Sequence, residues 1–178
     1  MINKRIYRNV ITPFLFLMLI FFSVNFQNTL WFGFFGNIPN PVLWPSVFVY
    51  LMTNRHSKSR YLWSVAFLLI LCAHSVALPL NVFLSLTLLA FLIRFTQKRF
   101  AAMATTDLMA FSFISTILFP LFYSLFSVIG YEYIYSLGRH SLNALLTLPF
   151  IPIILYLCKK IDRLFHGTDE SILLGNNL

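Results

Sequence analysis

Polar residues that could do chemistry are few and lie far apart in this sequence. His74, followed by Ser75, interrupts an apolar run long enough to approach membrane-spanning length. A histidine at that depth can bind a ligand or relay a proton, but it can equally form a hydrogen bond to a neighbouring helix. No acidic partner lies within the apolar runs. We therefore expect a structural role for His74.

The other polar candidates have positions typical of helix ends. Asp107 follows two threonines directly before an apolar run, where a carboxylate stabilises a helix N-terminus. Asn81 and Asn143 stand at the starts of two further runs, and we expect both to be caps. Cys72 and Cys158 form no CxxC pair, so the cysteines predict neither a disulfide nor a zinc site.

Recognisable catalytic motifs are absent from the sequence. It contains no HExxH, no GxSxG, no phosphate-binding glycine loop and no paired carboxylates. An intramembrane enzyme would need converging acid, base or nucleophile residues. The sequence therefore predicts a protein that is not an enzyme, with no catalytic residues, no cofactor and no metal.

Composition places the chain in a membrane. Of its 178 residues, 59% are hydrophobic and only 10% are charged, whereas a soluble domain carries about 25% charged residues. The net charge of +8 does not indicate nucleic acid, because the basic residues fall in short groups between apolar runs. The sequence predicts an all-α integral membrane protein embedded in the lipid bilayer.

Six apolar runs are candidate transmembrane helices, since a span needs about 20 apolar residues. They are Val10–Phe26, Val42–Met52, Tyr61–Leu78, Leu80–Phe95, Leu108–Ile129 and Leu142–Cys158. We expect residues 1–166 to form one six-helix transmembrane domain and residues 167–178 to form a short cytoplasmic tail. The first run also resembles a signal peptide, but no small-x-small cleavage site follows it, so we expect an uncleaved helix.

The distribution of basic residues supports the count of six. If the N-terminus is cytoplasmic, every Lys and Arg except Arg139 falls on the inner side, which is twelve of the 13 basic residues. The inner groups are Lys4, Arg5 and Arg8; Arg55, Lys58 and Arg60; Arg94, Lys98 and Arg99; and Lys159, Lys160 and Arg163. A scheme of five spans would scramble this division. Both termini are therefore predicted to be cytoplasmic.

Three prolines lie around the start of the second run, in the stretch NIPNPVLWPSVF. Pro39 and Pro41 are expected to stiffen an extended outer loop, and Pro45 fits the first turn of a helix that begins near Trp44. Val42–Met52 would be only about 16 Å long as a helix, short of a hydrocarbon core of about 30 Å. Either residues of the loop extend this span or the span is tilted within the bundle.

Several of these segments together resemble the MreD family, the small rod shape-determining membrane proteins of bacteria. The resemblance begins at Asn40-Pro41-Val42-Leu43-Trp44, with Tyr50 a little further on and a short basic loop at Asn54-Arg55-His56. It continues in the last run, where Pro149 and Pro152 lie inside an apolar helix that has a basic end. The family commonly has an arginine at the second span, which this chain lacks.

The resemblance implies a function without catalysis, as a scaffold of the cell-wall elongation complex (the elongasome) in the bacterial inner membrane. The implied partners are an MreC-like protein, an MreB-type filament, and a RodA-type glycosyltransferase with its transpeptidase, which together serve peptidoglycan synthesis and cell shape. The residues expected at a partner interface are Pro41, Trp44, Tyr50, Pro149 and Pro152.

The family fold is similar to that of the substrate-binding subunits of energy-coupling-factor vitamin transporters. The alternative function is therefore a small-molecule binding subunit of a transporter. That alternative predicts an outward-facing polar pocket, for which the candidate residues are His74, Asn81, Glu132 and Asn143.

Overall fold

The computed structural model describes residues 11–36, 38–54, 57–74, 78–97, 104–128 and 137–166, and within these ranges the regular structure is entirely helical. The predicted all-α class is thereby confirmed. The helices are α2 (Thr12–Asn25), the π-helical η2 (Phe26–Trp31), α3 (Phe32–Phe35), α4 (Trp44–Asn54), α5 (Ser57–His74), α6 (Pro79–Gln97), α7 (Thr105–Val128), α8 (Leu137–Thr147) and α9 (Ile151–His166). The basic group at Lys4, Arg5 and Arg8 and the expected tail 167–178 lie outside the described residues.

Three stretches of helix are long and apolar enough to cross a membrane: Thr12–Phe35, Pro79–Gln97 and Thr105–Ser127. A fourth crossing is counted if Gly138–Thr147 and Ile151–Arg163, which meet at a bend of 52°, form one broken span. All six predicted runs contain helix, but length and composition support three or four crossings. The six-span bundle therefore stays a prediction.

The first helix extends further than the sequence indicated. Its helical path runs without interruption from Thr12 to Phe35, a total of 24 residues, which is about 36 Å. The predicted end of the first run at Phe26 was therefore wrong, because the helix continues to Phe35. The uncharged, aromatic-rich residues after Asn25 continue the helix through a π-helical segment, and Gly36 ends it with a φ of 63°, a conformation that glycine adopts without a Cβ clash.

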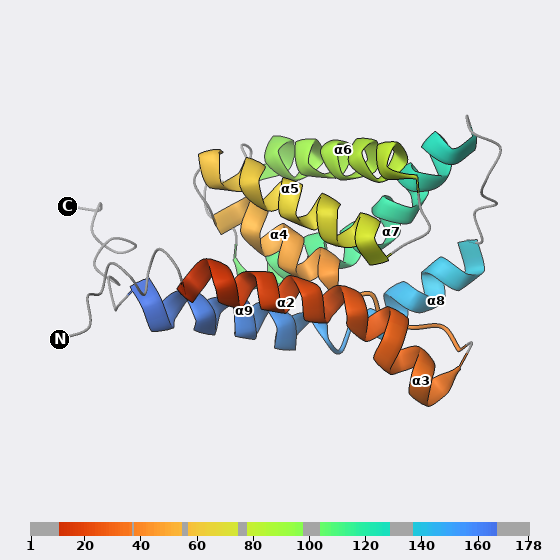
Figure 1. Cartoon of the computed structure of the whole chain (residues 1–178), viewed down its shortest axis with the longest axis horizontal. Coiled ribbons are helices and arrows are strands. Elements are labelled where there is room, and N and C mark those ends of the chain that lie inside the picture. The colour runs from red at the N-terminus through yellow and green to blue at the C-terminus, as the bar shows by residue number, and fades with distance from the viewer. Residues whose placement is uncertain are drawn as a thin grey trace.

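Helix α4 lies at the centre of the bundle (Figure 1). It contacts α2, α5, α6, α7 and α9, and every residue from Trp44 to Thr53 is buried. The sequence did not distinguish α4 in this respect, since the apolar α2 exposes Phe14, Phe21 and Phe22. With 11 residues, α4 is about 16 Å long, so its neighbours enclose it from end to end.

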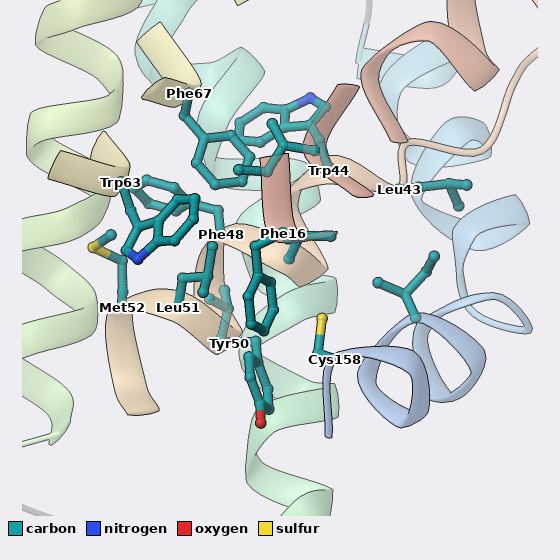
Figure 2. Close-up of a cluster of buried hydrophobic side chains, with 14 of the residues drawn as sticks. Phe16, Leu43, Trp44, Phe48, Tyr50, Leu51, Met52, Trp63, Phe67 and Cys158 are labelled. Carbon is teal, nitrogen blue, oxygen red and sulfur yellow. The ribbon is translucent and has the colours of Figure 1, made fainter. Parts of the chain in front are cut away.

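Aromatic side chains from several helices fill the core around α4 (Figure 2). The Trp44 ring meets Phe119 of α7 edge-on at 4.7 Å between centroids, and Phe48 meets Phe67 of α5 edge-on at 5.1 Å. Each such pair contributes about 0.5–1.5 kcal/mol beyond the burial of its surface. These contacts fix the position of α4 relative to α5 and α7.

Helix α7 packs against α4 and α6 with small polar side chains. Ser112, Ser115, Thr116 and Ser127 are all buried on it, and small residues let helix backbones approach closely. The Ser112 hydroxyl donates to the Leu108 carbonyl of its own helix at 2.7 Å. These hydroxyls are therefore part of the helix packing.

Candidate functional site

The proline-rich segment before α4 is fastened to α8 by two hydrogen bonds. The Asn40 backbone N–H donates to Asn143 Oδ1 at 2.9 Å, and the Val42 N–H donates to Thr147 Oγ1 at 2.8 Å. The two acceptors are four residues apart and so share one face of α8. Pro41, between the two donors, has no N–H and is buried. In Asn40-Pro41-Val42, both backbone N–H groups therefore have acceptors on α8.

The prolines at the start of α4 behave as the sequence predicted. The helix begins at Trp44, which places Pro45 at its second residue, where a missing N–H costs little. The Ser46 N–H donates to the Leu43 carbonyl at 3.2 Å and closes the first turn. Pro39 and Pro41 lie in the stretch without regular structure that precedes the helix. The prediction for Pro45 is confirmed.

Two further prolines surround the break between α8 and α9. The chain turns at Leu148–Pro149–Phe150, and Phe150 N–H donates to the Thr147 carbonyl at 2.9 Å across the turn. Pro152 is the second residue of α9, again a position that suits proline. The sixth run, predicted as one helix from Leu142 to Cys158, is therefore broken, and its helical structure begins at Leu137.

We call the kinked pair of helices α8 and α9, in which α9 continues from α8 at an angle of 52°, the α8–α9 hairpin. Its surface around the bend is apolar. Pro149 and Pro152 are exposed. Large apolar side chains on both sides of the bend are also exposed: Leu145, Leu148, Ile153 and Tyr156. The bend therefore carries an exposed apolar surface formed by side chains of two helices.

The predicted ligand residues are engaged in three different contacts between segments. His74 Nε2 lies 3.4 Å from Asn25 Nδ2 of α2, and its ring meets Phe21 edge-on. Asn81 Nδ2 donates to Ser127 Oγ of α7 at 3.2 Å. The expectation that Asn81 and Asn143 are caps was wrong, because Asn81 joins two helices and Asn143 holds a loop. Ser75 and Glu132 lie outside the described residues.

These neutral contacts define one end of the bundle, which we call the amide end because asparagine side chains supply most of its polar contacts. It consists of Asn25, His74, Asn40, Val42, Asn81, Ser127, Asn143 and Thr147. His74, the last residue of α5, contacts α2 through Asn25 and Phe21, and the structural role expected for it stays a prediction.

The opposite end carries the charged contacts, and we call it the basic end. The Tyr50 hydroxyl donates to Asp162 Oδ2 of α9 at 2.6 Å, and Lys159 Nζ donates to Thr105 Oγ1 of α7 at 2.6 Å. The carbonyl of Thr53, near the C-terminus of α4, accepts from Gln97 Nε2 at 2.8 Å and from Arg60 Nη2 at 3.5 Å. Its residues are Tyr50, Thr53, Arg60, Arg94, Gln97, Thr105, Lys159 and Asp162.

Asp107 has the capping role that the sequence predicted. Helix α7 begins at Thr105, and the N–H of Ala104 directly before it donates to Asp107 Oδ2 at 2.9 Å. This is the reciprocal half of a capping box, in which the third helical residue reaches back to the preceding N–H. The carboxylate also lies in the first turn, where the helix dipole favours a negative charge.

The five residues expected at a partner interface fall into two groups. Pro41, Trp44 and Tyr50 are buried within the chain itself; Pro41 is held against α8 by its neighbours, and Tyr50 is tied to α9. Pro149 and Pro152 are exposed at the bend. The chain itself therefore covers the first group and leaves the second group exposed, and the partner interface stays a prediction.

Sequence reasoning missed the acceptors that hold these segments. Thr147 and Asp162 were not singled out, yet each receives a hydrogen bond from a residue more than one hundred positions earlier. The spacing of Asn143 and Thr147 on one helical face was a signal that could have found the first site. Within the described residues, no group of three metal-ligating side chains comes together, and Cys72 and Cys158 are not joined by a disulfide.

Comparisons with known proteins do not extend this description. No protein-family model matches the chain, and neither a curated protein nor a solved structure matches it.

Proposed function

We propose that this chain is a bacterial inner-membrane scaffold of the cell-wall elongation complex and that it acts by binding partner membrane proteins through the α8–α9 hairpin. The proposal takes its biological setting from the resemblance to the MreD family. The observation that carries the mechanism is the hairpin itself, where Pro149 and Pro152 lie exposed at a 52° bend between two apolar helices.

The rest of the bundle supports this mechanism by holding the hairpin in place. The backbone N–H groups of Asn40 and Val42 fasten α8, and Tyr50 fastens α9. All three anchors belong to α4 or to the segment just before it. The buried central helix therefore sets the angle at which the hairpin is presented to a partner.

The position of the exposed apolar side chains fits a partner helix within the bilayer. Leu145 and Leu148 lie on one side of the bend, and Ile153 and Tyr156 on the other. Lipid tails are as apolar as leucine, so helices associate in membranes by shape and close packing. A bent surface offers a shape that a straight lipid-facing helix does not.

The proposed partners are an MreC-like protein, an MreB-type filament reached through it, and a RodA-type glycosyltransferase with its transpeptidase. The test is recovery of these proteins with the tagged chain from bacterial membranes in mild detergent. Pro149→Ala combined with Pro152→Ala is expected to lower recovery of the MreC-like protein about fivefold, which corresponds to roughly 1 kcal/mol at an interface.

The matched control is Pro79→Ala, which changes an exposed proline at the start of α6, away from the hairpin. Recovery with this variant should equal that with the unchanged chain. If the unchanged chain recovers none of these partners, the elongation role is refuted. If the hairpin and control variants behave alike, the hairpin is not the docking surface.

A further inference from the structure

Two arginines lie close together at the basic end. Arg60 is in the first turn of α5, and Arg94 is in the last turn of α6. Helices α5 and α6 pack against each other, and the start of α5 meets the end of α6 at the Thr53 carbonyl of α4. Gln97, three residues after Arg94 and thus on the same face of α6, donates to the Thr53 carbonyl that also faces Arg60.

The hydrogen-bonding capacity of Arg60 is largely unused. The hydrogen bond from Arg60 Nη2 to the Thr53 carbonyl spans 3.5 Å, which is at the long limit for a hydrogen bond. Its Nε is shielded from solvent and has no hydrogen-bond partner. Both side chains are only partly exposed, so water screens their repulsion less than it would at an open surface.

The carboxylates of the described part of the chain are engaged elsewhere. Asp107 accepts from the Ala104 N–H, and Asp162 accepts from the Tyr50 hydroxyl. The C-terminus of α4 offers a partial charge of only about −0.5 against two full positive charges. Arg60 also lies at the N-terminus of α5, whose dipole adds positive potential. The pair therefore favours an anion that the described residues do not supply.

We propose that Arg60 and Arg94 bind the phosphate of an anionic phospholipid headgroup at the basic end, between the start of α5 and the end of α6. A guanidinium offers a planar fork of N–H donors that fits phosphate oxygens in pairs. Arg60 and Arg94 supply two such guanidinium groups.

The location matches the chemistry of the headgroup layer. Helix α6 is one of the helices long and apolar enough to cross a membrane, and Arg94 lies near its end. Basic pockets between helices at the cytoplasmic face are sites where anionic headgroups bind. This inference depends on the membrane setting and not on the cell-wall role, so the two proposals fail independently.

The test measures binding of phosphatidylglycerol to the purified full-length chain in detergent, with phosphatidylcholine and inorganic phosphate as comparison ligands. We expect saturable binding of phosphatidylglycerol that Arg60→Gln combined with Arg94→Gln weakens about tenfold or more, because hydrogen bonds to a charged group are strong. The matched control is Lys160→Gln with Arg163→Gln. It removes the same charge from exposed positions on α9 and should change the affinity less than twofold.

Three results would overturn the proposal. An equal loss of affinity for phosphatidylglycerol in both double variants would mean that binding depends on general surface charge and not on Arg60 and Arg94. Equal affinity for phosphatidylcholine would remove the need for an anionic lipid. An affinity for inorganic phosphate equal to that for phosphatidylglycerol would mean that the site binds a soluble anion.

A second measurement guards against loss of folding in the double variant. Without added lipid, Arg94→Gln should raise the melting temperature, because it removes a repelling charge beside Arg60. A purely structural role for Arg94 predicts a lower melting temperature instead, and that result would count against the anion site. Arg60→Lys with Arg94→Lys keeps both charges but loses the planar forks, so its affinity should lie between those of the unchanged chain and the glutamine variant.

Discussion

Hydrogen bonds hold neighbouring segments together at both ends of the bundle, but the groups that form them differ. At the amide end, neutral side chains accept or donate within the protein, as when Asn143 and Thr147 hold the backbone of Asn40 and Val42. At the basic end, charged groups take part, as in the bond from Tyr50 to Asp162. The difference is one of charge, because the contacts at the amide end join neutral groups, whereas Arg60, Lys159 and Asp162 take part at the basic end.

The comparison also separates the two proposals made for this chain. The amide end holds a loop rigidly against α8 and thereby supports a hairpin for partner proteins. The basic end has two arginines, Arg60 and Arg94, and the Nε of Arg60 has no hydrogen-bond partner, so this end suits an anionic ligand. Variants that discriminate between the ends therefore test protein binding and lipid binding apart from each other.

The largest effect is expected at the amide end. Asn143→Ala with Thr147→Val removes both acceptors of the proline segment and leaves two backbone N–H groups without partners. An unsatisfied buried donor costs about 1–3 kcal/mol, so the free energy of unfolding should fall by about 3 kcal/mol. Denaturant titration in mixed micelles measures the change.

The control for this variant is Thr87→Val. The Thr87 hydroxyl is exposed and donates only to the Phe83 carbonyl of its own helix, so its removal should change the free energy of unfolding by less than about 0.5 kcal/mol. If the double variant is no less stable than this control, the proline segment is not held by α8, and the amide end has no role in positioning the hairpin.

A smaller effect is expected at the basic end. Tyr50→Phe removes the hydroxyl that donates to Asp162, and we expect a loss of about 2 kcal/mol, within the range for a hydrogen bond to a charged group. A double-mutant cycle with Asp162→Asn isolates the pair. A coupling energy near zero would show that α4 and α9 are held together by apolar packing alone.

Lys159→Met supplies the matched comparison at the same end. Its ammonium donates to Thr105 in an exposed contact, and such exposed contacts contribute little to stability. The change in the free energy of unfolding should be about 0.5 kcal/mol or less. An effect as large as that of Tyr50→Phe would mean that charge, and not the buried geometry of Tyr50, stabilises this end.

Much of the helical framework could be predicted from the sequence, and the reasons are local. The uncharged run around Trp44 predicts a helix, and Pro45 predicts its first turn. Asp107 after two threonines predicts the start of α7. In each case the residue affects its own backbone or that of its near neighbours. The position of the helix can therefore be predicted from the local sequence.

The parts that could not be predicted depend on tertiary contacts. The bond from Tyr50 to Asp162 joins residues 112 positions apart, and no periodicity connects them. Asn81 and Asn143 have the residue type of caps, but partners from other segments give them a different role. The continuation of the first helix past Asn25 was missed because polar residues there (Gln27, Asn28 and Thr29) are typical of a loop.

The central claim is that the α8–α9 hairpin docks partner proteins, and site-specific photo-crosslinking tests it most directly. A photoreactive phenylalanine analogue replaces Ile153 on the hairpin in one variant and Leu69 on α5 in another; both positions are exposed and apolar. The account predicts crosslinks from position 153 to an MreC-like or RodA-type protein and none from position 69. Equal crosslinking at the two positions, or only lipid adducts at position 153, would contradict it.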